Sequence, residues 1–303
     1  MIDSKIETLI AVNETKSFTK AAEILSLTQP AISQHIKQIE SDLGIKLFYR
    51  VSGELKATPE GEIALKYAQR IKTLYQNLQQ RLLDEKHHAK RISAGITHTA
   101  ENNRMSNIFA KYCSENEGIR VTIISDTINN LYNKLKNYEI DLAIVEGKLS
   151  DPSLNSILLD TDCLMLAVSN SNPLSGKSMV TLDELKKEKM ILRLPSSGTR
   201  NLFVSHLVSN NVSIDEFNVI LEVDNIATIK ELVRQNFGVS ILAKSACMED
   251  VRKGYLKILP VENLSMTREI NIVYHKDFEH TEVLSDIMKL YYEMSDNSFM
   301  MYE

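Results

Sequence analysis

The chain has 303 residues, of which 43% are hydrophobic and 25% are charged, a balance typical of a globular protein with roughly two domains. No apolar run approaches the ~20 residues of a membrane-spanning helix, and residues 1–20 lack the apolar core of a signal peptide, so we expect a cytoplasmic protein without membrane contact. The net charge of −5 excludes a uniformly basic nucleic-acid binder. Residues 1–90 hold 13 Lys and Arg against 11 Asp and Glu, whereas the remainder holds 22 against 29. The N-terminal part is therefore slightly basic, which allows it to meet an anion.

Residues 17–44 predict two short helices joined by a tight turn. The first has Ser17 as its N-cap and an apolar face of Phe18, Ala21, Ala22 and Leu25. Pro30 lacks an amide hydrogen and is tolerated only in a first helical turn, so it marks the start of the second helix, with Thr28 or Gln29 as the cap and Gly44 as the stop. The second helix has an apolar face of Ile32, Ile36, Ile39 and Leu43, and roughly opposite lie Pro30, Ser33, Gln34 and Lys37.

Two interpretations of this helix pair stay open at this point. Exposed amide and hydroxyl groups can pair with base edges, and a helix N-terminus favours a phosphate, as in a helix-turn-helix. A helical hairpin with a solvated polar face would have the same spacing. Residues 45–61 favour DNA binding, because they predict a two-stranded ribbon with a turn at Gly53. Such a wing would bring Arg50 and Lys56 near the DNA backbone or the minor groove.

A long helix is predicted to follow the ribbon. Thr58 is its N-cap, Pro59 takes the first helical position, and the helix runs to about His88. A near-heptad seam is formed by Ala64, Tyr67, Ile71, Leu74, Leu78 and Leu82. A helix of ~30 residues spans ~45 Å, which is too long for residues 1–57 to bury. We therefore predict a partner helix from a second chain rather than packing on its own domain.

Residues 1–88 resemble the LysR-type transcriptional regulators, through "SFTKAAEILSLTQPAISQHIKQIESDLGIKLFYR" followed by "ATPEGEIAL". The resemblance implies a winged helix-turn-helix (1–57), a dimerising linker helix (58–89) and an effector-binding domain (90–303). That domain would have two α/β subdomains of periplasmic-binding-protein type, subdomain I at about 90–161 and 267–303 and subdomain II at about 162–266. The family usually forms dimers of dimers. We predict DNA contacts from Ser17, Thr28, Gln29, Pro30, Ser33, Gln34, Lys37 and Arg50, with Gln29, Ser33 and Gln34 reading bases.

The remainder of the chain alternates strands and helices. "ISAGIT", "IRVTIIS" and "IDLAIVEG" read as strands separated by helices at 101–116 and 129–138, which predicts a parallel sheet covered on both faces. A second unit begins at "LDTDCLMLAVS" and includes strands in "MILRLPSS", "VILEVDN" and "VSILA". "REINIVYH" and a helix at 280–294 close the fold, with chain crossings near 161–163 and 265–268. "SNSNPLSG", "SSGTR" and "VRQNFGVSIL" also resemble the family, although Asn236 stands where many members have Gly.

Polar residues gather at the predicted strand ends, where ligands of open parallel sheets bind. The candidate effector-binding residues are Thr97, His98, Thr99, Thr127, Glu146, Ser196, Ser197, Gly198, Thr199 and Asn225. By the resemblance, Thr97, Thr99, Thr127, Ser197 and Thr199 match effector-contacting positions. Each alone could be an ordinary helix N-cap, and Arg200 is interpreted as structural. Because helix N-termini favour anions, we predict a small organic anion as the effector.

An enzyme and a periplasmic solute receptor are the rival interpretations. The sequence contains no HExxH, Walker loop, GxSxG or Cys/His metal spacing, so we expect no catalytic residue, metal or cofactor. Cys113, Cys163 and Cys247 are far apart, which indicates a reducing compartment, although a redox-sensing pair stays open. We expect as partners double-stranded DNA, further copies of the chain and the effector, with RNA polymerase as an additional candidate.

Overall fold

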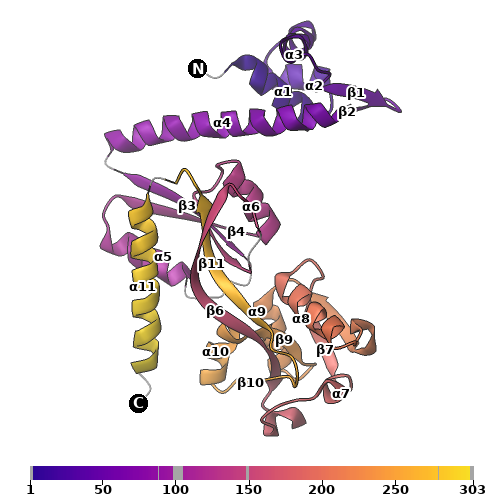
Figure 1. The fold of residues 1–303 in the computed structure, drawn as a ribbon, viewed down its shortest axis with the longest axis vertical. Helices are drawn as coiled ribbons and strands as arrows, with labels where there is room; N and C mark the ends of the chain where they lie inside the picture. Colours follow the sequence, from indigo (N-terminus) through magenta and orange to yellow (C-terminus); the bar gives the residue numbers. More distant parts are fainter. Residues whose placement is uncertain (1–2, 88, 98–104, 148–149, 279, 301–303) are drawn as a thin grey trace. The chain divides into compact units, whose positions relative to one another are not determined.

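The computed structural model describes residues 3–87, 89–97, 105–147, 150–278 and 280–300, without the side chains of 295–300. Two compact units are present, one formed by Met1–Lys90 with Asn137–Glu139 and the other by Arg91–Lys136 with Ile140–Glu303. Figure 1 labels the helices and strands of each unit.

The N-terminal unit begins with a compact head. Its elements are α1 (Ser4–Thr15), α2 (Phe18–Leu25), α3 (Gln29–Leu43), β1 (Phe48–Val51) and β2 (Glu54–Ala57). Thr28 rather than Gln29 caps α3, and Gly44 ends it with φ +66°, the left-handed conformation that glycine adopts readily. Val12, Ala21, Ile32 and Leu47 are fully buried in one core. The antiparallel pair β1–β2 forms the wing that the sequence predicts.

Helix α4 (Pro59–Lys86) has Thr58 as its N-cap and ends one to two residues before the predicted end. Its first three turns pack on the head through Gly61, Leu65 and Ala68. The N–H of Thr58 donates to the backbone oxygen of Leu47 at 3.0 Å. A Cβ atom on Gly61 would overlap that same oxygen, so only glycine allows this close approach of helix and loop.

The second unit has two lobes, and the described residues of lobe I form three strands and three helices outside the crossing strands. They are β3 (Lys90–Thr97), α5 (Met105–Glu115), β4 (Ile119–Asp126), α6 (Ile128–Lys136), β5 (Leu142–Glu146) and α11 (Thr281–Met300). Side chains alternate across β5: Leu142 and Ile144 pack with α5 and α11, whereas Ala143 and Val145 pack with α6. Both faces of the sheet are therefore covered by helices.

Two long strands, β6 (Leu154–Ser169) and β11 (Thr267–His275), run side by side from lobe I into lobe II (Figure 1). The strand order is β10-β6-β11-β5-β3-β4, with β9 also pairing β6. β3 and β5 are parallel, but β11 pairs antiparallel with both β5 and β6. The βαβ pair β3 and β5 is parallel, as the sequence predicts, and β11 adds an antiparallel strand because the chain returns from lobe II in the opposite direction.

Lobe II lies between these strands in the sequence. Its elements are a 3₁₀ turn η2 (Pro173–Gly176), α7 (Leu182–Leu185), β7 (Lys189–Arg193), α8 (Gly198–Ser209), η3 (Ile214–Glu216), β8 (Asn218–Val223), α9 (Ile226–Arg234), β9 (Ser240–Ala243), α10 (Lys244–Arg252) and β10 (Leu256–Leu259). β7 and β8 are parallel. Asn236 has φ +60°, so asparagine occupies the left-handed position expected there.

Candidate nucleic-acid interface and effector site

The outward face of α3 holds most of the predicted DNA contacts. Pro30, Gln34 and Lys37 are exposed, and Ser33 is partly buried. The side-chain amide of Gln29 donates to the hydroxyl of Ser33 at 2.9 Å, so two predicted base-reading groups orient each other. The remaining lone pairs of Gln29 and the hydroxyl proton of Ser33 are still available to a partner.

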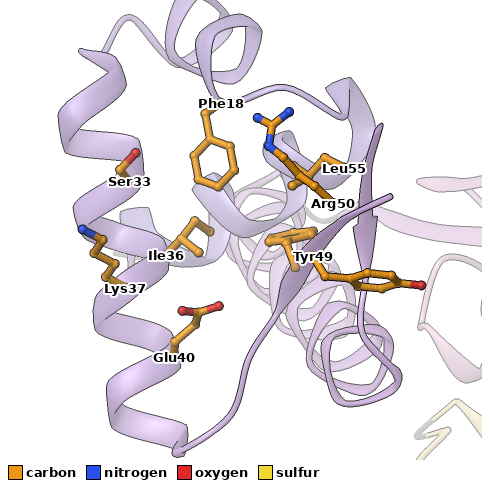
Figure 2. Close-up of a pocket in the computed structure, with 9 residues that line it drawn as sticks. Phe18, Ser33, Ile36, Lys37, Glu40, Tyr49, Arg50 and Leu55 are labelled. Carbon is orange, nitrogen blue, oxygen red and sulfur yellow. The ribbon is translucent and has the colours of Figure 1, made fainter. Parts of the chain in front are cut away.

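A cavity of about 340 Å³ lies between α3 and the wing (Figure 2). Ile36 and Leu55, both buried, contribute apolar lining. Ser33, Lys37 and Arg50 also line it, and the guanidinium of Arg50 donates to the backbone oxygen of Gly53 at 3.0 Å, which fixes it to the turn of the wing. The cavity thus combines cations from two elements with the carboxylate of Glu40, which is held by Lys46 and by the backbone N–H of Leu47. Lys37 and Arg50 are placed where they could hold a phosphate.

The orientation of α3 depends on a contact that sequence reasoning did not consider. The fully buried Thr8 of α1 donates its hydroxyl proton to Ser4, so its oxygen can only accept from Nδ1 of His35, 2.8 Å away on α3. Ser17, the other predicted backbone contact, caps α2 and accepts from the N–H of Lys20.

The predicted seam of α4 is an exposed apolar stripe within its unit. The exposed members are Tyr67, Ile71, Leu74, Leu78 and Leu82, with relative exposures of 45–59%, and Ala64 is partly buried. Exposed apolar side chains at near-heptad spacing indicate an interaction surface.

Three predicted effector residues meet at one buried arginine in the junction between the lobes. Arg268 of β11 donates from Nη2 to Glu146 at the end of β5, 2.9 Å away, and from Nη1 to Thr199 in the first turn of α8, 3.4 Å away. Thr97, at the end of β3, donates to the other oxygen of Glu146 at 3.1 Å. The side chains of Arg268 and Glu146 are only 6% and 5% exposed. Lobe I and lobe II therefore share a polar contact at the predicted site.

Asp162 on β6 completes this group. Its carboxylate lies 3.4 Å from Nη2 of Arg268 and accepts from the hydroxyl of Ser245 on α10 at 2.7 Å. We call Thr97, Glu146, Asp162, Thr199, Ser245 and Arg268 the junction cluster. Sequence reasoning missed Asp162, Ser245 and Arg268. The sequence signal that could have identified Asp162 and Arg268 was a charged residue within an apolar strand at each of the two expected chain crossings.

Within the described part of the chain, the other predicted effector residues make hydrogen bonds or lie at positions separate from the junction cluster. Thr127, Ser197 and Asn225 are N-caps of α6, α8 and α9. An N-cap is the alternative to effector contact that the sequence left open for these residues. Ser196 and Gly198 are exposed beside the start of α8. His98 and Thr99 lie outside the described residues.

Two further arginines of lobe II are buried against β8. Arg193 pairs with Asp224 at 3.1 Å, and Arg200 pairs with Glu222 at 3.3 Å. Burial lowers the pKa of Arg200, and the charge of Glu222 opposes this effect. The interpretation of Arg200 as a structural residue agrees with this ion pair.

The described part of the chain offers neither a cluster of metal ligands nor a disulfide. There, no group of three or more His, Cys, Asp or Glu is arranged to hold a metal ion, and no helix is long and apolar enough to cross a membrane. The cysteines are unpaired. Burial raises the pKa of Cys247 to about 12, and burial followed by the charge of Asp162 raises that of Cys163, so neither favours a reactive thiolate.

Comparisons with known proteins agree on one family. The model described as "Bacterial regulatory helix-turn-helix protein, lysR family" matches residues 4–62, and the "LysR substrate binding domain" matches residues 85–294. The HTH-type transcriptional regulator CysL of Bacillus subtilis is 24% identical over 292 residues, covering 95% of this chain and 97% of CysL. A probable RuBisCO transcriptional regulator of Thalassiosira pseudonana is 28% identical over 276 residues, covering 88% and 89%.

Solved structures share the fold. Full-length BenM is 26% identical with a TM-score of 0.58 and 98% of both chains covered. Full-length CbnR in complex with its target DNA is 18% identical with a TM-score of 0.67, covering 97% of this chain and 99% of CbnR. The predicted architecture, a helix-turn-helix head, a long helix and a periplasmic-binding-protein-like α/β domain, is confirmed. The chain therefore belongs to the LysR family of DNA-binding transcriptional regulators, which is not a family of enzymes.

Proposed function

We propose that this regulator binds promoter DNA through α3 and the wing, as a dimer joined along α4, and responds to a small carboxylate bound between the two lobes. The observation that carries the effector proposal is that Arg268 contacts both Glu146 and Thr199, while Thr97 donates to Glu146. An ordinary set of N-caps would not require a buried guanidinium between the lobes.

In the DNA-bound form, α3 lies in the major groove. Gln29, Ser33 and Gln34 contact base edges, and their mutual geometry is supported by the hydrogen bond from Gln29 to Ser33. Lys37 and Arg50 hold a phosphate, or Arg50 enters the minor groove, as the cavity that they share suggests. Ser17 contacts the backbone at the start of α2.

The occupant of the α4 stripe is the same helix of a second copy. A seam that repeats every three or four residues is complementary to itself, so two identical helices can interlock along it. A tetramer would need a second interface, and RNA polymerase remains a candidate partner without a surface assigned to it.

The effector carboxylate binds beside Arg268. The Nε atom of this arginine is buried and has no hydrogen-bond partner among the described residues. Such an orphaned donor has a strong preference for an acceptor. The first turn of α8, capped by Ser197, adds backbone N–H groups on the lobe II side. Binding there would favour one relative position of the lobes, because a ligand acts through its different affinity for two states.

The test is a gel-shift titration on DNA upstream of the protein's own gene, at several salt concentrations. Arg50→Ala should weaken binding to all sequences and reduce the salt dependence, because it removes a phosphate contact. Gln34→Ala should cost ~1–3 kcal/mol mainly at the cognate site, because it removes a base contact. Two variants that bind the cognate operator as the wild type does would overturn the assignment of α3.

A further inference from the structure

One carboxylate of α3 holds the base of the wing. Glu40 accepts from the backbone N–H of Leu47 at 2.9 Å through Oε1 and from Nζ of Lys46 at 2.6 Å through Oε2. The side chain of Glu40 is only 12% exposed, whereas that of Lys46 is 78% exposed. Water therefore screens the ion pair, and the hydrogen bond to Leu47 is the contact that fixes the loop.

The peptide groups that Glu40 reaches are also bonded to the start of α4. Leu47 precedes β1 and Thr58 follows β2, and the N–H of Thr58 donates to the backbone oxygen of Leu47, which extends the β1–β2 ladder by one pair. The hydroxyl of Thr58 donates to the backbone oxygen of Lys46. The two strands of the wing are thus joined at their base, and Glu40 ties this base to α3.

The same carboxylate lies at the proposed DNA-binding face. Glu40 lines the cavity between α3 and the wing together with Lys37 and Arg50 (Figure 2). A negative charge there repels phosphates, so its charge alone opposes DNA binding. Its hydrogen bond to Leu47 acts in the other direction: Leu47 is fully buried, and without Glu40 its N–H would lose the acceptor that holds the loop in place.

We propose that Glu40 is a positioning residue for DNA binding, which holds the wing at the distance from α3 that lets Arg50 and Lys37 contact the same stretch of DNA backbone. This inference rests on the proposed function, because it takes α3 and the wing as the DNA-contacting elements. Arg50 is fixed to the turn of the wing through Gly53, so a shift of the wing base carries Arg50 with it. A loop that is already held in its bound position loses less conformational freedom on binding, which raises affinity.

The experiment compares Glu40→Met with Glu40→Gln in gel shifts of the full chain, on DNA upstream of its own gene and on a non-cognate duplex of the same length. Both variants keep the length of the side chain and remove its charge, but only glutamine keeps an acceptor for the N–H of Leu47. Charge alone therefore predicts equal or tighter DNA binding for both. We expect Glu40→Gln to retain the ratio of cognate to non-cognate affinity and Glu40→Met to lower it by at least ~5-fold, because the wing loses its fixed position.

A double-mutant cycle separates positioning from a general loss of stability. Arg50→Ala should lower the cognate affinity of the wild type by ~10-fold but that of Glu40→Met by no more than ~3-fold, because the contact is already weakened there. Lys46→Met breaks the exposed ion pair, leaves the hydrogen bond to Leu47 and should keep the affinity ratio. Circular dichroism at the assay temperature verifies the fold of each variant, and Glu40→Ala takes the place of Glu40→Met if that variant is unfolded.

The inference is overturned if Glu40→Met keeps the affinity ratio of the wild type, if Glu40→Gln loses as much as Glu40→Met, or if the costs of Glu40→Met and Arg50→Ala simply add in the double variant. Arg50→Ala by itself reports on the proposed function. A single variant Arg50→Ala that binds as the wild type does refutes the wing contact of the proposed function, whereas a costly Arg50→Ala with additive effects refutes only the role of Glu40.

Discussion

Replacing Arg268 with methionine tests whether the junction cluster depends on its one buried cation. The side chains of Arg268, Glu146 and Asp162 are 5–6% exposed, so water cannot replace the lost charge. Two unit charges ~4 Å apart interact by ~4 kcal/mol at an effective dielectric constant of ~20. Breaking a buried pair costs ~3–5 kcal/mol, because the partner is left charged and buried. We expect the free energy of unfolding of the second unit to fall by ~3–5 kcal/mol.

The assay is urea denaturation followed by circular dichroism, with the two units treated as separate transitions. Arg120→Met provides a control, since Arg120 is an exposed residue of β4. In the double variant Arg268→Met/Glu146→Gln, one of the two buried carboxylates that Arg268 contacts also loses its charge, so ~1–3 kcal/mol of the loss should return. A loss as small as that of Arg120→Met, or a double variant no more stable than Arg268→Met, would refute the reasoning.

Three other predictions concern separate parts of the chain. Leu74→Asp would place an unpaired charge in the α4 seam, so light scattering should give a smaller mass than the wild type, whereas an unchanged mass would contradict the dimer. Gly61→Ala should lower the melting temperature, because the added Cβ overlaps the backbone oxygen of Leu47, although helix propensity alone predicts a gain in stability of ~1 kcal/mol. Gly176→Ala is the control and should have little effect, because a Cβ there meets no atom within 4 Å. Hydrogen bonds from the hydroxyl and the backbone N–H of Ser153 lower the pKa of Asp151 to about 2 from 3.8, so this carboxylate stabilises the fold above pH 4 and its contribution of at most ~2 kcal/mol is lost as the pH falls from 4 to 2. Ser153→Ala removes the hydroxyl but keeps the backbone N–H, so in acid titrations it should remove part of that contribution, and an unchanged acid profile would contradict it.

The DNA-binding head could be predicted because its signals are local. Thr28 marks the start of α3 through its side-chain hydroxyl, and Pro30 and Gly44 mark its start and end through their backbone properties. Helix α10 was missed, because Ala243 precedes it and makes no side-chain cap. Helix α1 was also missed, although Asp3 caps it.

The junction cluster, which we propose as the effector site, could be predicted only in part. Hydroxyl and carboxylate groups at strand ends follow from the βα pattern, so Thr97, Glu146 and Thr199 were found. Arg268 was not, because its contacts depend on the register in which β11 lies opposite β6, which pairs it with Asp162. That register is set by tertiary packing rather than by any residue near Arg268 in the sequence.

The position of β11 has a consequence for how the protein is made. This strand lies between β6 and β5, yet it follows lobe II in the chain, so residues 164–266 must leave the ribosome before it can insert. At ~5–20 residues per second, this interval lasts roughly 5–20 s. During that time the nascent lobe I holds β3, β4 and β5 with the pairing edge of β5 uncovered, a site where another chain could add a strand. The last steps of translation therefore close the sheet, and a ribosome that stalls within lobe II would leave this edge open to aggregation.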